Sequence, residues 1–331
     1  MPTILLPTPQ NLAHAATVLR GGGLVAIPTE TVYGLAANAA DKSAVARIFA
    51  AKGRPKGHPL IVHMASADDV GGWAVDLSPL AHKLMAAFWP GPLTLIAKKS
   101  DATLLDVTGG LQTVALRVPN HPVALELLRL VGGGLAAPSA NRFGSVSPTT
   151  ASHVAQSLGD SVDVIIDGGP CRVGVESTIV DVSGVDPESG MAAVLRPGGV
   201  SLEALSQVAG MAVKVHTSAT VSAPGQLPSH YAPEAPVRLV PARELASEAA
   251  TLAAQGLRVA VLTDDADAPW PPGVVAIHLP RDPNLAAARL YAALREVDQH
   301  KCHVALTSLP LPQGLGAAVA DRLRKAAGPR G

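Results

Sequence analysis

Apolar and polar residues follow two different periods along the first 209 residues. Stretches with apolar residues three and four positions apart predict helices at 11–20, 43–52, 80–88, 122–130, 150–158 and 202–208. Short apolar runs bounded by glycine, proline or polar residues predict strands at 24–27, 60–63, 93–98, 114–118, 135–137, 164–167 and 178–182. This mixture indicates an α/β fold, and the irregular spacing of its elements favours some antiparallel pairing in the sheet.

The pattern stops after residue 209 and resumes near residue 236. Residues 210–235 are rich in Ser, Pro and Thr and show no apolar period, so we interpret them as a linker. Beyond them, the pattern predicts strands at 237–240, 258–263, 274–278 and 303–308, with helices at 243–254, 284–297 and 315–326. We therefore expect a domain at 1–209, a linker at 210–235 and a smaller Rossmann-like α/β domain at 236–331.

Composition and charge exclude some classes of function for this chain. Hydrophobic residues make up 48% of the chain and charged residues 16%, so a large core can form. Lys and Arg together number 26, as do Asp and Glu, which argues against strong direct nucleic-acid binding through the overall field. We expect no membrane span and no signal peptide, because no long apolar run free of charge occurs. The distant Cys171 and Cys302 indicate a reduced, cytoplasmic chain without a disulfide framework.

Several common catalytic motifs are missing from the sequence. There is no P-loop, and two G-x-G-x-x-A matches, Gly21–Ala26 and Gly132–Ala137, precede a strand where the dinucleotide fingerprint requires a helix. These glycines predict helix ends. No Ser-His-Asp order or H-E-x-x-H motif is present, and His58 and His63 have a spacing that suits no common metal cluster. We therefore expect no metal site built from protein ligands.

A loop between a predicted helix and a predicted strand concentrates positive charge. Lys52, Arg54 and Lys56 lie within five residues of a Gly- and Pro-rich segment. Lysine supplies a mobile point charge, and arginine a planar fork that grips two oxygens of a phosphate or carboxylate. A solvated charged loop is an equally good interpretation of these residues taken alone.

Three other segments place polar side chains at strand ends. Ser139 and Asn141 follow an apolar run, and the polar residues 145–150 precede a predicted helix, whose N-terminus favours an anion. The segments 28–35 and 174–181 each place hydroxyls and a carboxylate beside a buried strand. Capped turns remain the alternative for each segment alone.

Taken together, these segments resemble one family. The matching stretches follow one another between about residues 10 and 205: PTETVYGLA, AKGRPKGHPLIVH, WPGPLTLIAK, VALRVPNHP, APSANRFGSVSPTTASHV, IIDGG, GVESTIVDV and LRPGG. The chain resembles the threonylcarbamoyl-AMP synthase family, which has a YrdC-type domain. The SHYAP motif at 229–233 and the α/β domain after it resemble the long, two-domain form of this family.

The resemblance implies both a fold and a reaction. The fold is an open, twisted α/β sheet with a large, positively charged concave cavity. The reaction joins L-threonine, bicarbonate and ATP, with Mg²⁺, into threonylcarbamoyl-AMP and releases pyrophosphate. This is the first step of the threonylcarbamoyl modification of the tRNA adenosine next to the anticodon, and a downstream tRNA-modifying transferase complex receives the product.

The resemblance also implies roles for particular residues. Four catalytic residues come from the K-x-R and S-x-N signatures: Lys52, Arg54, Ser139 and Asn141. Threonine contacts come from Thr31, His63, Arg117, Ser139 and Ser177, with Arg117 expected to hold the threonine carboxylate as a fork. ATP contacts come from Arg54, His58, Thr113, Asn141, Thr149, Arg196 and the linker residue Tyr231. The linker is expected to close over the site.

Two other functions were weighed against this one. A non-catalytic RNA-binding module would use cavity cations for phosphates, but neutral charge and only 3% aromatic residues argue against it. A related carbamoyl transferase component would carry extra cysteine clusters for zinc, and this chain has only two cysteines.

Overall fold

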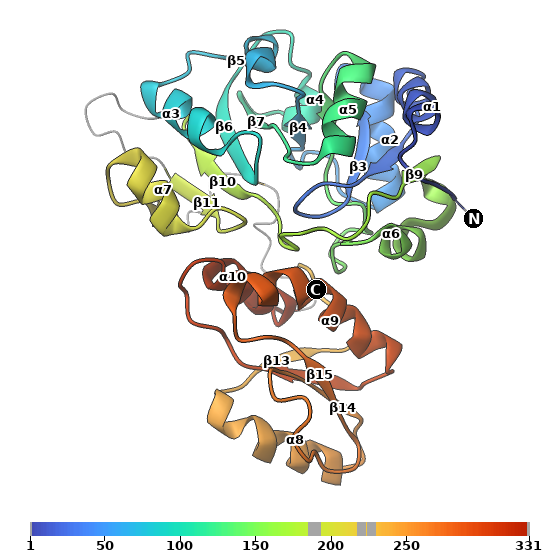
Figure 1. Ribbon diagram of the computed structural model, residues 1–331, viewed down its shortest axis with the longest axis vertical. Helices are drawn as coiled ribbons and strands as arrows, with labels where there is room; N and C mark the ends of the chain where they lie inside the picture. Colours follow the sequence, from blue (N-terminus) through green and yellow to red (C-terminus); the bar gives the residue numbers. More distant parts are fainter. Residues whose placement is uncertain (1, 185–192, 217–222, 224–229, 330–331) are drawn as a thin grey trace. The chain divides into compact units, whose positions relative to one another are not determined.

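The computed structural model describes residues 2–184, 193–216, 223 and 230–329. The chain divides into two compact units (Figure 1). Unit one comprises residues 1–143, 148–172 and 176–226, and unit two comprises 144–147, 173–175 and 227–331. The expected linker is shared between the units, and its residues 217–222 and 224–229, with Ser229 of the SHYAP motif, lie outside the described residues. The linker therefore stays a prediction.

Unit one contains a mixed sheet of twelve strands among the described residues. The strands are β1 (Thr3–Leu5), β2 (Val25–Ile27), β3 (Gly34–Asn38), β4 (Ile61–His63), β5 (Ala74–Val75), β6 (Leu93–Lys99), β7 (Thr113–Arg117), β8 (Leu135–Ala136), β9 (Val164–Ile166), β10 (Thr178–Asp181), β11 (Ala193–Arg196) and β12 (Lys214–Val215). Their order is β1-β9-β2-β3-β8-β4-β7-β6-β10-β11-β12, and β5 pairs with β6. The sheet contains both parallel pairs, such as β4 with β7, and antiparallel pairs, such as β6 with β7. The mixed α/β fold with antiparallel pairing is confirmed.

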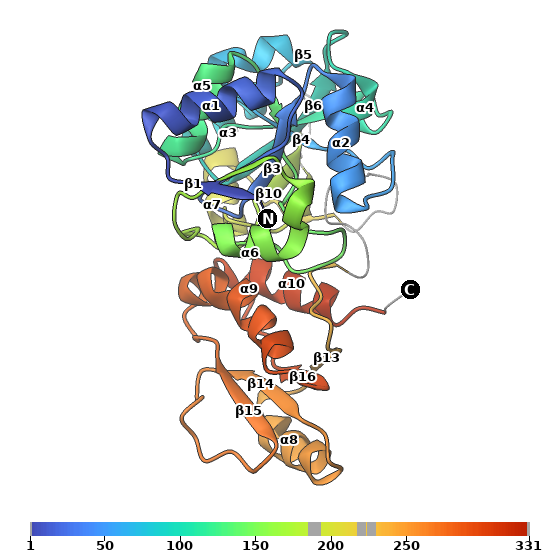
Figure 2. The ribbon, with the colours of Figure 1, turned by 90° about the vertical axis from the view of Figure 1, so that its right-hand side faces the viewer.

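Helices cover this sheet on two sides. They are α1 (Pro9–Arg20), α2 (Lys42–Lys52), α3 (Pro79–Phe88), α4 (Leu105–Thr108), α5 (Pro122–Val131), α6 (Ala151–Leu158) and α7 (Leu202–Ala209), with short 3₁₀ turns at Ala67–Gly72 and Gly159–Ser161. Alternate residues of β2 enter different cores, because side chains of a strand point to opposite faces. Val25 and Ile27 pack with α1 and α5, which lie side by side (Figure 2). Ala26, and Leu24 just before the strand, join the larger cluster that includes α2 and α3.

Four central strands also contribute to an apolar cluster that is separate from the two helix-covered cores. Ile61 of β4, Ala115 of β7, Ile96 of β6 and Ile179 of β10 form a separate apolar cluster. Ala223, from the expected linker, packs on this cluster and is buried. The neighbouring positions on this face belong to candidate site residues, so the apolar cluster forms a floor between them.

Unit two contains a four-stranded sheet among the described residues. The strands β13 (Val237–Leu239), β14 (Val259–Thr263), β15 (Val274–His278) and β16 (Val304–Thr307) lie in the order β13-β16-β14-β15, and all their pairings are parallel. Helix α8 (Leu245–Ala254) packs on one face through Leu245 and Leu252, after a 3₁₀ turn at Ala242–Glu244. Helices α9 (Pro283–Gln299) and α10 (Gly316–Ala326) lie on the other face (Figure 1). This is the Rossmann-like arrangement expected for the C-terminal region.

Some strands were not predicted from the hydrophobic pattern. Strand β3 has the sequence GLAAN, which lacks the β-branched and aromatic residues that signal a strand, and four of its five residues are buried. Strands β1, β5 and β12 contain three residues or fewer, too few to show a period. Strand β11 was noted only as the motif LRPGG. Of the helices that the structure describes, none combines the length and apolar character that crossing a bilayer demands.

Candidate active site

The K-x-R signature lies at the C-terminal end of α2. Gly53 ends the helix with a φ of 62°, in the left-handed region that glycine adopts without strain. The chain therefore turns between Lys52 and Arg54, and both side chains are buried. Arg54 Nη2 donates to the carbonyl of Pro59 at 2.9 Å, and its guanidinium lies over the ring of Phe143. The helix end thus carries two buried cations side by side.

Lys52 joins the two signature segments directly. Its Nζ donates to the backbone carbonyls of Ser139 and Asn141, each at 2.6 Å. In return, the backbone N–H of Phe143 donates to the Lys52 carbonyl at 2.8 Å. The structure therefore brings the K-x-R and S-x-N signatures together. The Lys52 ammonium holds the loop in place, since both of its acceptors here are main-chain oxygens.

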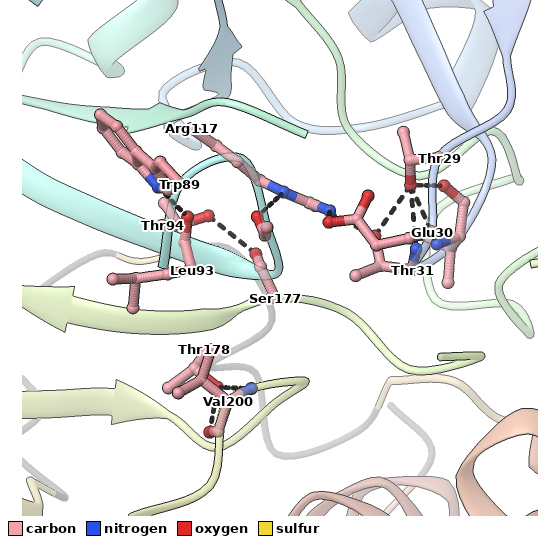
Figure 3. Close-up of polar contacts among 12 residues, drawn as sticks. Thr29, Glu30, Thr31, Trp89, Leu93, Thr94, Arg117, Ser177, Thr178 and Val200 are labelled. Atoms are coloured by element: carbon pink, nitrogen blue, oxygen red, sulfur yellow. Dashed lines mark hydrogen bonds and ion pairs between the residues drawn. The ribbon is translucent and has the colours of Figure 1, made fainter. Parts of the chain in front are cut away.

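Another buried cation, Arg117, contacts residues of the β2–β3 loop. Arg117, the last residue of β7, donates from Nη1 to Thr31 Oγ1 at 3.0 Å and from Nε to the Gly91 carbonyl at 3.2 Å. Its Nη2 lies 2.8 Å from Glu30 Oε1 as an ion pair (Figure 3). His63 is the register partner of Arg117 across β4 and β7, so three expected threonine contacts converge here.

Ser177 and Arg196 meet at the ends of β10 and β11. Arg196 Nη2 donates to the Ser177 carbonyl at 2.9 Å and to Ser177 Oγ at 3.2 Å. Ser177 Oγ also lies 2.7 Å from Thr94 Oγ1 of β6 (Figure 3). Gly198 lets its loop pack against this segment, because a Cβ there would lie within 2.4 Å of backbone atoms of Glu176, Ser177 and Thr178. Arg196, which is expected to bind ATP, is therefore hydrogen-bonded to Ser177, which is expected to bind threonine.

The remaining expected ATP contacts are more dispersed. Thr113 begins β7, about 13 Å along the strand from Arg117. His58 packs its ring edge-on against Phe143, with centroids 5.5 Å apart. Thr149 is buried before α6, and Tyr231 belongs to unit two, where it stacks on Tyr291 and lies under Arg322. Hydrogen bonds therefore join Lys52 to the Ser139–Asn141 segment, Arg117 to Thr31, and Arg196 to Ser177.

Burial sets the charge state of the site histidines. It lowers the pKa of His63 to about 3, with Arg117 adding to the shift, while the carbonyls of Ile61 and Leu135 oppose it. His63 is therefore neutral near pH 7 and can offer a hydrogen bond without a charge. Burial also lowers the pKa of His58, and Arg54 adds to that shift. Burial lowers the pKa of the Lys52 ammonium, with Arg54 in the same direction and Glu176 in the opposite one.

Comparison with known proteins places this arrangement in a family. Residues 17–198 match the family model Sua5_yciO_yrdC, described as telomere recombination. Residues 200–328 match a second model, described as threonylcarbamoyl-AMP synthase, C-terminal domain. The chain belongs to the Sua5/YciO/YrdC family.

Relatives of this family cover nearly the whole chain. Threonylcarbamoyl-AMP synthase from Pyrococcus abyssi is 42% identical over 96% of this chain and 94% of its own length. The enzyme of that name from Bacillus subtilis is 41% identical over 97% of this chain and 94% of its own. The crystal structure of P. abyssi Sua5 complexed with L-threonine superposes with a TM-score of 0.90 and 40% identity, covering 99% of this chain and 97% of that one. The two-domain Sua5 fold expected from the sequence is confirmed.

Sequence reasoning overlooked some polar residues that this Sua5 site contains. Thr94 carries no signal in its segment, because a single threonine in an apolar strand is ordinary. Glu30 and Glu176 stand in the two segments noted for hydroxyls and a carboxylate, yet neither was given a role. Both are buried among the site cations. A charged side chain inside an otherwise apolar and hydroxyl-rich stretch was the signal that could have found them.

Proposed function

We propose that this chain is an L-threonylcarbamoyladenylate synthase, a nucleotidyltransferase. It joins L-threonine, bicarbonate and ATP into threonylcarbamoyl-AMP, releases pyrophosphate, and so supplies the threonylcarbamoyl modification of tRNA. The observation that carries the proposal is the contact of Arg196 with Ser177. An adenylate forms only where a phosphate group and the amino acid derivative are held side by side, and this contact makes their expected binding residues neighbours.

The buried cations suit a reaction among anions. The neutral amine of threonine and bicarbonate give a carbamate with loss of water. The carbamate oxygen then attacks the α-phosphorus of ATP, the bond from that phosphorus to the bridging oxygen breaks, and pyrophosphate leaves. Two like charges about 4 Å apart repel by ~4 kcal/mol at an effective dielectric constant of 20. Lys52, Arg54, Arg117 and Arg196 are all buried here and offset this repulsion. Holding the reactants in line can contribute a further ~7–11 kcal/mol, and no covalent nucleophile is needed.

Hydroxyl groups around Arg117 support the choice of threonine. Thr31 and Ser177 present hydroxyls, and His63 adds a neutral ring. A site that hydrogen-bonds a substrate hydroxyl strongly rejects analogues that lack it. Serine keeps the hydroxyl and is discriminated by only the ~1–3 kcal/mol that a methyl group is worth.

Magnesium enters as part of the nucleotide. Mg²⁺ is commonly bound by substrate phosphates together with one or two carboxylates, and it keeps several waters. Glu176, a buried carboxylate near Lys52, could assist. Among the described residues, no three His, Cys, Asp or Glu side chains converge, which favours an ion held mainly by ATP. When bound, the ion neutralises the phosphate charge.

The proposal extends to the linker and to the cellular context. Ala223 packs on the apolar floor of unit one, which supports a linker that covers the site and excludes water from the adenylate. Tyr231 is proposed to contact ATP as part of that cover. A cytoplasmic location, where thiols such as Cys171 stay reduced, and transfer of the product to a tRNA-modifying complex complete the proposal.

A product assay tests the function. The chain is incubated with ATP, Mg²⁺, bicarbonate and L-threonine, and adenylate and pyrophosphate are separated by chromatography. Arg54→Ala should abolish product, whereas Arg142→Ala, an exposed arginine next to Asn141, should retain it. If the chain instead binds RNA in a salt-dependent manner and consumes no ATP, the RNA-binding alternative replaces this one.

A further inference from the structure

A buried carboxylate beside the expected threonine contacts has an unused oxygen. Glu30 lies in the β2–β3 loop and is 1% exposed. Its Oε1 forms the ion pair with Arg117, but neither carboxylate oxygen accepts a hydrogen bond from any residue that the structure describes. Buried polar atoms nearly always have such partners, because their lost hydration is otherwise uncompensated. Glu30 Oε2 is therefore suited to a donor that the chain itself does not supply.

The loop holds this carboxylate in a fixed place. Thr29 Oγ1 accepts from the backbone N–H groups of Thr31 and Val32, at 3.2 and 3.3 Å, and lies 2.9 Å from Thr31 Oγ1. These hydrogen bonds fix the backbone of the turn that carries Glu30 and Thr31, and Arg117 contacts both side chains (Figure 3). The carboxylate is thus tied to the residues expected to contact threonine.

The other groups around Glu30 add no second cation. His121 faces it from the start of α5, and burial lowers the pKa of that imidazole. Cys171 faces it from the loop after β9, and burial raises the pKa of that thiol to about 12. Both groups are neutral near pH 7, so Arg117 supplies the positive charge among the described groups that face Glu30. The Glu30 carboxylate can therefore accept a hydrogen bond from one more cationic group while its ion pair with Arg117 stays in place.

The substrate of the proposed function has such a donor. Threonine is a zwitterion near pH 7, with an ammonium and a carboxylate on the same carbon. Its expected contacts contain no negative charge: Thr31, His63, Arg117, Ser139 and Ser177. The Glu30–Arg117 ion pair offers the complementary charges: the Glu30 carboxylate suits the ammonium of threonine, and the Arg117 guanidinium suits its carboxylate.

We propose that Glu30 Oε2 accepts a hydrogen bond from the α-ammonium of threonine, while Arg117 holds the carboxylate. This inference rests on the proposed function and names the partner of one substrate group. Glu30 is a positioning residue, because it fixes the nitrogen that will carry the carbamate. The other buried acid of the site, Glu176, acts on Lys52 instead, where it raises that pKa.

Paired ligands isolate this contact. L-Threonine and (R)-3-hydroxybutanoate share the carboxylate and the hydroxyl and differ in the ammonium. Binding of each to the full chain without ATP is measured by isothermal titration calorimetry. The unaltered chain should prefer threonine by about 10- to 100-fold, as expected for a hydrogen bond between charged groups. In Glu30→Gln this preference should fall below about threefold, mainly through weaker threonine binding.

Two further variants exclude a merely structural role. Glu30→Asp keeps the charge and should retain most of the preference, and Glu126→Gln, which removes an exposed acid of α5 paired with Arg129, should leave it unchanged. Equal weakening of both ligands in Glu30→Gln would show that Glu30 only supports Arg117, and would overturn the inference. Equal affinities in the unaltered chain would overturn it too, even if Glu30→Gln failed to fold. If either of these two results were found while the unaltered chain still made the adenylate, the inference about Glu30 would be wrong but the proposed function would be retained.

Discussion

The two units of the chain place their charged side chains differently. In unit one, Glu30, Arg117 and Arg196 are buried at or after the ends of strands, and Lys52 is buried at the end of helix α2. Lys52, Arg117 and Arg196 bond to loops distant in sequence. Around the sheet of unit two, ion pairs such as Arg281 with Asp264 lie largely in solvent, and apolar residues fill the positions under α8. Buried charge in this unit lies on α10, where Arg322 pairs with Asp321 and lies over the ring of Tyr231.

This difference separates a region shaped by function from one shaped by stability. A buried charge loses its hydration, so it persists only where partners compensate for that loss or where chemistry requires it. Unit one buries charged side chains at several positions around one face of its sheet. The sheet of unit two has the usual composition of a parallel α/β sheet, with apolar strands between helices. The comparison predicts that charge changes around the site of unit one will matter far more than charge changes around the sheet of unit two.

The largest effect should follow from breaking the buried ion pair. Arg117→Ala leaves the Glu30 carboxylate buried beside no cation, which should destabilise unit one by about 3–5 kcal/mol and abolish adenylate formation. Urea unfolding is followed by fluorescence of Trp73 and Trp89 in a Trp270→Phe background, so that only unit one reports. Arg117→Lys keeps the charge and should lose less. A loss below about 1 kcal/mol in Arg117→Ala would contradict the role of this pair.

A somewhat smaller effect should follow at the junction of the two signatures. Lys52→Met keeps the volume of the side chain but removes the donor to the Ser139 and Asn141 carbonyls. Loss of these two hydrogen bonds to main-chain oxygens should cost about 2–4 kcal/mol in unit one, and product should fall at least about 100-fold because the loop shifts. The same fluorescence and product assays measure both.

Lys98→Met is the matched control for that change. Lys98 is an exposed lysine of unit one, ion-paired with Asp76 at 3.5 Å, so its loss should change stability by no more than about 1 kcal/mol. Similar losses in the two lysine variants would show that burial of Lys52 carries no special weight.

A pH effect should come next in size. The pKa of His63 is about 3 in the folded chain, below its ordinary value of 6.5, so the unfolded chain binds the proton more readily. The stability that His63 contributes is therefore complete above pH 6.5 and lost as pH falls, by about 1.4 kcal/mol per unit. Between pH 6.5 and 5 this amounts to about 2 kcal/mol.

Unfolding of unit one at several pH values measures this slope. His63→Gln removes the titrating group, so stability of that variant should fall less steeply between pH 6.5 and 5. His58 is also expected to contribute in the same direction, because its pKa is lowered too. Parallel curves for the chain and the variant would mean that His63 is charged in the folded state.

The smallest effect should appear in unit two. Arg281→Ala removes the partner of Asp264, but the arginine side chain is 84% exposed. Exposed pairs contribute about 0–1 kcal/mol, so unfolding followed by Trp270 should barely change, and salt should reduce even that difference. A loss as large as that of Arg117→Ala would erase the contrast between the units.

The sequence predicted most helices and several strands, because their apolar periods are local. Helix α2 and its glycine end, for example, were visible from the residues 43–53 alone. Strand β3 was not, since the small residues of GLAAN become a strand only when β2 and β8 pair on either side of it. In the site, the signatures predicted which segments matter, but not which atoms meet.

By itself, the sequence determined the two-region organisation, the family and the segments that carry polar groups, because these depend on local pattern and on motif order. Only the tertiary structure decided that Lys52 bonds main-chain oxygens 87 and 89 residues away, and that Arg117 lies between Thr31 and Glu30. Such contacts arise from the order of strands in the sheet. That order is set by the packing of the whole unit, so no single stretch of sequence encodes it.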